Sequence, residues 1–339
     1  MSSSISSSDI SRSDAAWGRC LAAFLGALGI GALLILVLMV LVDPYDSGQF
    51  GLLGIEGVVD QNATTADASR ARDPRFDSAI FGNSTGQLLD PADLSPATGK
   101  HFVQLVAPGA DPRGQLAILD FFIRHHPHIG ALVVVTDELW CSHNPAPLPA
   151  NLFPFWLYDG SKLDYARHLF SWRALDHAFQ RITIGLGSRK RMAPDGFWSY
   201  EEVWPPGGKH PAVTTPPQQP PFAGQVSDVF PIETLLEGAI KKLPAEVAVV
   251  LLVPPTFFTI IPQPGSLAAA EHEACNKAFR SIVAGRPHSN FIDYRIDNAL
   301  SRDPANFVDL IHYRAKIAQK IDQGVIASFA FGNAAKIDF

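Results

Sequence analysis

Ser84, Asp309 and His312 are the residues of this 339-residue chain whose types and spacing could do covalent chemistry. A serine hydroxyl is a weak nucleophile near neutral pH, so it needs an adjacent base, and the base needs a group that orients it. Asp309 precedes His312 by three residues. On one loop or one helical turn, that spacing brings carboxylate and imidazole to the same side. Asp309 could then hold one ring nitrogen while the other faces Ser84, which predicts nucleophilic catalysis.

Ser84 lies in a segment that is typical of a tight turn after a buried strand. The segment reads Ile80-Phe81-Gly82-Asn83-Ser84-Thr85-Gly86, and its glycines permit close backbone approach. A serine at the start of a following helix exposes its hydroxyl beside backbone N–H groups. The alternative is an ordinary loop in which Ser84 only caps that helix. In the same way, Asp309 could cap the last helix and His312 could be a surface residue.

Strands and helices alternate along most of the chain after residue 76, which predicts an α/β fold with a mostly parallel sheet. Sites in such sheets form beyond the carboxyl ends of the strands. Five residues follow expected strands or lie on the loops after them, so we expect them to meet at one edge: Ser84, Gly109, Asp137, Asp309 and His312. The expected strands are 78–81, 101–106, 129–135, 247–253 and 290–294, and the expected helices are 115–126, 232–242, 266–283 and 313–326.

Residues 142–231 interrupt this alternation, so we expect an insertion that covers the carboxyl edge of the sheet. It contains a helix-like stretch over 163–184 and a loop rich in proline and glycine over 205–224. Aromatic residues are dense in it. They could stack on sugar rings, but such residues more often form a local core, and we favour that interpretation.

The N-terminal region predicts a single membrane anchor. The 23 residues between Arg19 and Asp43 carry no charge, and at ~1.5 Å per residue a helix of this length exceeds the ~30 Å hydrocarbon core. A cleaved signal peptide is the alternative, but its apolar region would be shorter. We expect a disordered cytoplasmic tail over 1–16, a transmembrane helix over 17–42 and a linker over 43–75. Basic residues flank only the N-terminal side, which predicts a periplasmic or extracellular domain.

The composition argues against nucleic acid as a partner, because the formal net charge is -6 and the pI is near 6.0. No metal or cofactor is expected. His125, His126 and His128 lie at the end of a helix without other ligands at metal-type spacing. Cys141 and Cys275 lack such spacing too; they could pair in an oxidising compartment, or they could be two buried thiols.

The motifs described above resemble those of the SGNH (GDSL-like) hydrolase superfamily. The resemblance rests on Phe81-Gly82-Asn83-Ser84, on Gly109 after the second strand and on Asp309-x-x-His312 before the last helix, and it covers residues 76–330 without the insertion. It implies a three-layer α/β/α flavodoxin-like fold. It also implies that Ser84 is the nucleophile, His312 the base and Asp309 the group that orients it, with oxyanion-hole N–H groups from Ser84 and Gly109.

Two positions depart from the pattern of that superfamily. Asn83 replaces the usual aspartate before the serine, and Thr136-Asp137 stands where a Gly-x-Asn signature is expected. An ionised Asp137 facing a developing oxyanion would raise the barrier of the reaction. Asn83 or Asn144 could supply the missing donor instead, or Asp137 could be structural.

The anchor narrows the resemblance to membrane-anchored proteins of this superfamily that act in bacterial cell-envelope acyl transfer, as in teichoic-acid D-alanylation and alginate acetylation. It implies a serine esterase or O-acyltransferase that acts on acyl esters of an envelope glycan or lipid. The implied partners are the membrane and either an envelope polysaccharide or an acyl donor protein. The alternative is a catalytically weak or inactive module that binds glycan or scaffolds an envelope complex.

Overall fold

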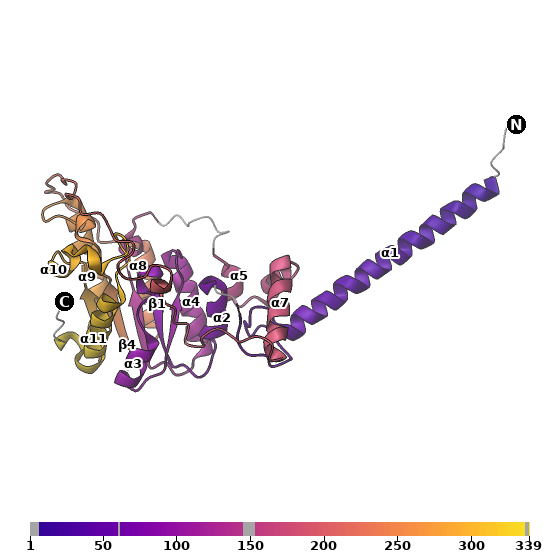
Figure 1. Cartoon of the computed structure of the whole chain (residues 1–339), viewed down its shortest axis with the longest axis horizontal. Helices are drawn as coiled ribbons and strands as arrows, with labels where there is room; N and C mark the ends of the chain where they lie inside the picture. The colour runs from indigo at the N-terminus through magenta and orange to yellow at the C-terminus, as the bar shows by residue number, and fades with distance from the viewer. Residues whose placement is uncertain (1–6, 60–61, 145–152, 336–338) are drawn as a thin grey trace.

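The computed structural model describes residues 7–59, 62–144, 153–335 and 339. An α/β body stands at the base of one long helix (Figure 1). Its sheet has five parallel strands in the order β2-β1-β3-β4-β5. The α/β class and the parallel sheet are thus confirmed. The strands are β1 (Ser78–Gly82), β2 (Phe102–Val106), β3 (Ala131–Val135), β4 (Ala248–Val253) and β5 (Asn290–Asp293).

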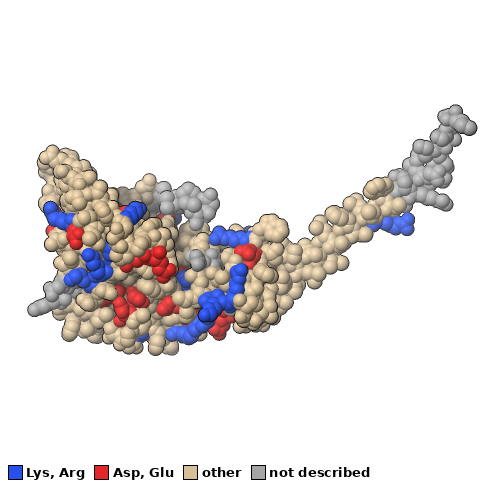
Figure 2. All heavy atoms as spheres, viewed as in Figure 1, with Lys and Arg blue, Asp and Glu red and all other residues tan. Residues whose placement is uncertain are grey.

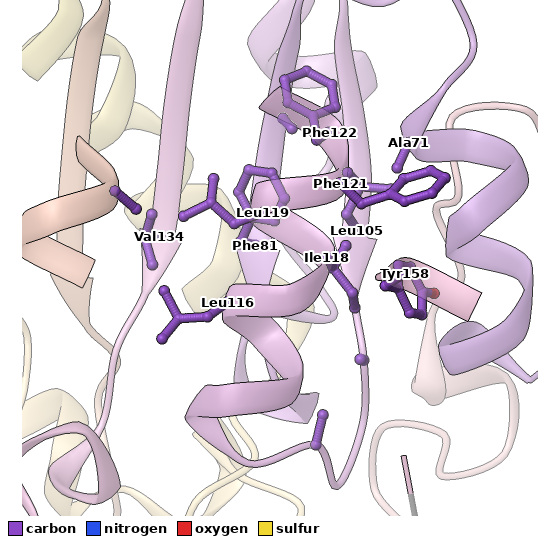
Figure 3. Close-up of a cluster of buried hydrophobic side chains, with 14 of the residues drawn as sticks. Ala71, Phe81, Leu105, Leu116, Ile118, Leu119, Phe121, Phe122, Val134 and Tyr158 are labelled. Carbon is purple, nitrogen blue, oxygen red and sulfur yellow. The ribbon is translucent and has the colours of Figure 1, made fainter. Parts of the chain in front are cut away.

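Helices cover both faces of the sheet, which explains why four of the five strands are buried along their whole length. On one face, α4, α8 and α9 pack against side chains such as Phe81, Leu105 and Val134 (Figure 3). On the other face, α3 and α11 pack against the alternate side chains of the same strands. The α-helices that follow α1 are α2 (Ala63–Ala71), α3 (Pro91–Thr98), α4 (Pro112–His125), α5 (Phe155–Tyr158), α6 (Lys162–His168), α7 (Trp172–Gly185), α8 (Pro231–Lys241), α9 (Leu267–Val283), α10 (Ala299–Arg302) and α11 (Ala315–Phe331).

The strand order places a topological switch between β1 and β3. The chain leaves β1 toward β2 on one side and later returns to β3 on the other side. Connections after these two strands therefore diverge, and the crevice between them is where open α/β sheets bind ligands. Ser84 follows β1 and Asp137 follows β3, so both lie at this switch point.

The first helix, α1 (Ser7–Val42), contains an apolar stretch over Ala16–Val42 that is long enough to cross a membrane, and its most apolar 18 residues have a mean hydropathy of 2.9. The helix begins at Ser7, so the expected disordered tail over 1–16 is wrong for residues 7–16. Residues 1–6 lie outside the described residues.

Residues 43–75 were expected to be a linker, but much of this segment packs into the body. The reason is Arg181 of α7, whose guanidinium is buried. It donates to the carbonyl oxygen of Val42 at 2.7 Å and to the carboxylate of Asp46 at 2.9 Å, and it also donates to the carbonyl of Asp43. The guanidinium thereby binds carbonyl groups that the end of α1 leaves without helical partners.

Within the described part of the expected insertion over 142–231, the chain forms α5, α6 and α7 and adds no strand to the sheet; residues 145–152 lie outside the described residues. The single helix expected over 163–184 is two helices, α6 and α7, because the Ser171 side chain accepts from the Ala174 N–H at 3.1 Å and begins a new helix. Farther on, the insertion runs along the outer edge of the sheet. Gln104 of β2 donates its backbone N–H to the Asp195 carbonyl at 2.7 Å.

Candidate active site

A one-turn 3-10 helix, η1 (Ser84–Gly86), holds Ser84 directly after β1. The Asn83 side chain caps it by accepting from the backbone N–H of Thr85 at 3.0 Å and from its hydroxyl at 2.8 Å. Gly82 permits the approach to β3, because a Cβ atom there would lie 2.8 Å from the Cβ of Val135. The turn therefore needs a glycine before it and a small polar cap, and it leaves Ser84 partly exposed.

A short closed loop before α11 carries the other two residues. Phe307 and Tyr313 pair as an isolated bridge, and Val308 donates its N–H to the His312 carbonyl at 2.7 Å. The residues between them, including Asp309, are thus turned back toward the carboxyl edge of the sheet.

The structure brings Ser84, His312 and Asp309 together, as the sequence predicted. His312 Nε2 lies 2.9 Å from Ser84 Oγ, and His312 Nδ1 lies 2.9 Å from each carboxylate oxygen of Asp309. Burial raises the pKa of Asp309, but hydrogen bonds from the His312 ring and from two backbone N–H groups outweigh it, so the net pKa is well below the ordinary value. An ionised Asp309 keeps the proton on Nδ1, which leaves Nε2 to accept from the Ser84 hydroxyl.

Two aromatic residues of the insertion pack beside the His312 ring. The Tyr200 ring meets the imidazole edge-on with 5.6 Å between centroids, and Trp204 lies 6.5 Å away. The Tyr200 hydroxyl donates to the carbonyl of Tyr313, and Arg314 donates to the carbonyl of Trp204. The sequence showed only that aromatic residues are dense here and did not indicate that these two contact the base.

Two backbone N–H groups that the resemblance assigns to an oxyanion hole are without an acceptor in the part of the chain that the structure describes. Within the described residues, neither the Ser84 N–H nor the Gly109 N–H donates a hydrogen bond. Gly109 lies on the exposed loop after β2 with a φ of 74°, which favours glycine. These two groups match the oxyanion-hole donors that the resemblance implies, although their roles stay a prediction.

Asn83 and Asp137 bind each other. Asn83 donates its Nδ2 to Asp137 Oδ2 at 2.6 Å, and the other oxygen of Asp137 accepts from the Leu139 N–H at 2.9 Å, where it caps a 3-10 helix at Glu138–Cys141. Burial, with the charge of Glu138 next, raises the pKa of Asp137 to about 6. Asp137 therefore has a structural role in fixing Asn83. Asn144, the other proposed donor, is exposed on the following loop.

A cavity of about 290 Å³ lies on the β2 side of the turn that holds Ser84. Val106 and Pro108 line it from the end of β2 and the loop that also carries Gly109, and Gln87 lines it from the end of the serine turn. Met192 and Trp198 of the insertion close it, and Gln87 donates to the Trp198 carbonyl at 3.1 Å. The lining is mostly apolar, as is usual for small-molecule sites.

The described residues hold no cluster of three or more histidine, cysteine or acidic side chains that could bind a metal ion. The Nδ1 atoms of His125 and His126 bond to backbone carbonyls one turn earlier in α4. Cys141 and Cys275 form a disulfide with 5.7 Å between their Cα atoms. This disulfide links the 3-10 helix at Glu138–Cys141 to α9.

Comparison of the sequence with known proteins identifies no matching family model and no matching curated protein.

Proposed function

We propose that this chain is a membrane-anchored serine esterase or O-acyltransferase of the SGNH type, acting on acyl esters of a cell-envelope glycan or lipid. The observation that carries the proposal is the hydrogen-bonded series Ser84–His312–Asp309 at the switch point of the parallel sheet. A serine that only caps a helix and a histidine that only lies on the surface need not be hydrogen-bonded to each other. A serine that is activated as a nucleophile needs such a hydrogen-bonded series.

In the proposed reaction, His312 Nε2 takes the hydroxyl proton as Ser84 Oγ attacks the ester carbonyl. The carbonyl oxygen becomes an oxyanion that the N–H groups of Ser84 and Gly109 stabilise. Collapse breaks the bond to the alcohol, which leaves with the proton from His312, and an acyl-serine remains. Water or a sugar hydroxyl then attacks the acyl-serine with His312 again as base, which releases the acid or forms the new ester.

The cavity beside β2 is the proposed site for the apolar part of the substrate, because it shares a loop with Gly109 and a turn with Ser84. The proposed location is outside the cytoplasm. Two features support it: basic residues that flank only the N-terminal side of the apolar stretch, and the disulfide between Cys141 and Cys275, which is typical of oxidising compartments.

Covalent labelling of the full chain in detergent by an alkyl fluorophosphonate tests the proposal. We expect a label on Ser84, read by peptide mass spectrometry, and none on Ser84→Ala. His312→Ala should slow labelling by about 10²–10⁴-fold, the usual contribution of a general base. Asp309→Asn should also slow it, because the imidazole is then held in the wrong tautomer. Ser171, an exposed serine that caps α7, should take up no label.

The pairing of Asn83 with Asp137 favours a second candidate, a module that binds envelope glycan without turnover, since Asn83 donates to the Asp137 carboxylate instead of to an oxyanion, and an ionised carboxylate can only accept. Folded protein that takes up no label at Ser84 at mildly alkaline pH would put this candidate ahead of the enzyme.

A further inference from the structure

Large apolar side chains are exposed on one part of the body, where it meets the base of α1. Trp172, Leu186 and Leu52 have 86%, 75% and 78% of their surface exposed. We call the set the collar, and its members are Leu52, Leu53, Leu163, Phe170, Trp172, Phe179 and Leu186. An exposed apolar cluster of this kind marks a surface that binds protein or membrane.

The collar belongs to elements that pack directly on the last turns of α1. The loop that carries Leu52 and Leu53 folds back along α1, with the Leu53 N–H donating to the Leu41 carbonyl at 3.2 Å. Tyr165 of α6 donates its hydroxyl to the Asp43 carboxylate. Helix α7 lies crosswise between the body and α1 (Figure 1), and Arg181 joins the two.

Helix α7 is amphipathic, as are helices that lie in a membrane interface. Trp172, Phe179 and Leu186 recur every seven residues, so they share one face, while Arg181 is buried on the opposite face. Asp176 is the charged residue on the outward face, and Gln180 donates to it at 2.7 Å.

The charge around the collar also suits a lipid surface. Leaving out the buried Arg181, residues 155–191 contain six Lys and Arg against three Asp, although the whole chain has a net charge of -6. Blue Lys and Arg spheres gather where the body meets α1 (Figure 2). Basic residues near a bilayer are attracted to anionic lipid.

The length of α1 sets the depth of the collar. The 23 uncharged residues between Arg19 and Asp43 make a helix ~35 Å long, about 5 Å more than the ~30 Å hydrocarbon core. The excess is the C-terminal end, where Met39 and Val42 are buried by the body. The loop of Leu52 and Leu53 lies along this end, so the collar is placed at the level of the lipid headgroups.

We propose that the collar inserts into the headgroup region of the leaflet nearest the body, so that the body lies on the bilayer surface in a fixed orientation. The occupant is lipid because the collar residues Leu52 and Leu53 lie against the last turns of α1, next to apolar side chains of α1 that are exposed, such as Ile35 and Val37. This inference rests on α1 spanning a bilayer and not on the chemistry proposed for Ser84.

Site-directed fluorescence on the full chain in vesicles tests the collar. An environment-sensitive nitrobenzoxadiazole label is attached to Trp172→Cys, Phe179→Cys or Leu186→Cys in a Cys20→Ala background, without reductant so that the disulfide stays intact. Vesicles contain phosphatidylcholine, with or without phosphatidylglycerol. We expect emission at shorter wavelength than in water, and loss of most of it when nitroxide-labelled lipids are included.

The matched controls are Val213→Cys and Phe331→Cys, which are similarly exposed. Phe331 ends α11, and the segment of Val213 pairs through Pro221 with Ser266 at the start of α9; both helices lie on the side of the body away from α1 (Figure 1). The control labels should emit as in water and keep their emission with nitroxide lipids. Collar labels that behave like these controls would overturn the inference. So would an apolar emission that nitroxide lipids leave unchanged, because it would mean that a second copy or another protein covers the collar. Neither result depends on whether Ser84 takes up a fluorophosphonate.

Discussion

Asp137 puts a carboxylate next to the turn of the proposed nucleophile, where the resemblance implies an amide. Its oxygens are both engaged, one by Asn83 and one by the backbone of Leu139. Asn83 in turn caps the turn that carries Ser84. In the folded chain, Asp137 therefore acts on Ser84 through Asn83, as a positioning residue.

Asp137→Asn should slow fluorophosphonate labelling of Ser84 about fivefold to tenfold at pH 8. An asparagine can present its one oxygen to Asn83 or to the Leu139 N–H but not to both, and a lost hydrogen bond costs about 1 kcal/mol. The pH profile tests the origin of the effect. Since the pKa of Asp137 is about 6, the wild-type rate should change as this carboxyl titrates, and the corresponding inflection should be absent from the variant.

Glu138→Gln is the matched control, because Glu138 is exposed and its charge helps to raise the pKa of Asp137. It should leave the labelling rate at pH 8 unchanged. Faster labelling of Asp137→Asn would contradict the positioning role and would mean that an ionised Asp137 opposes the developing oxyanion.

At the level of elements, the sequence predicted the strands and the edge at which the site forms. Continuous apolar runs such as 129–135 can be buried on both faces only as central strands, and the residues after parallel strands must share one edge. The meeting of Ser84 with His312 and Asp309 follows from that rule, and it was predicted although 228 residues separate Ser84 from His312.

Two sets of contacts could not be predicted from the local sequence pattern: those of the insertion with the site, and those of residues 43–75 with the body. The Tyr200 ring reaches His312 only through the fold of an irregular segment. The segment after α1 packs into the body because of Arg181, which lies 139 residues after Val42. Such partners leave no periodic signal in the sequence, so a segment rich in Gly and Asp suggested a loose linker.

Helix α11 carries a buried acid, Asp322, against the start of α3. Burial raises its pKa to about 8, and the charges of Asp93 and Asp90 add to the effect. The folded pKa therefore exceeds the ordinary 3.8, so the protonated carboxyl favours the folded state fully below about pH 4. This contribution is lost as the pH rises to about 8.

Asp322→Asn should remove this pH dependence. At pH 9 we expect the variant to be more stable than the wild type by about 2–5 kcal/mol, because it avoids a buried anion. At pH 5 the difference should be small. Thermal unfolding of the full chain in detergent measures the stability of the variant and the wild type at each pH. Asp228→Asn, at an exposed position, should behave like the wild type at either pH. A variant that is less stable at pH 9 would rule this explanation out.

At the scale of the whole molecule, the disulfide joins parts of the body on either side of the insertion. The chain has three cysteines, and Cys20 is free and exposed on α1. Denatured protein purified without reductant should therefore show one titratable thiol, and three after reduction. The Cys20→Ala variant should show no titratable thiol before reduction and two after it. Three thiols before reduction would mean that the bond between Cys141 and Cys275 does not form in the cell.

Arg181 also has a consequence for the time at which the chain can finish folding. A ribosome makes α1 first, and that helix can enter a bilayer while the rest of the chain is still being synthesised. The Arg181 guanidinium, which binds the C-terminal end of α1, lies 139 residues after Val42 in the sequence. At ~5–20 residues per second, synthesis of that stretch takes roughly 7–28 s. With α1 as the proposed anchor, the nascent chain is held at the membrane during that interval before the junction between α1 and the body can form.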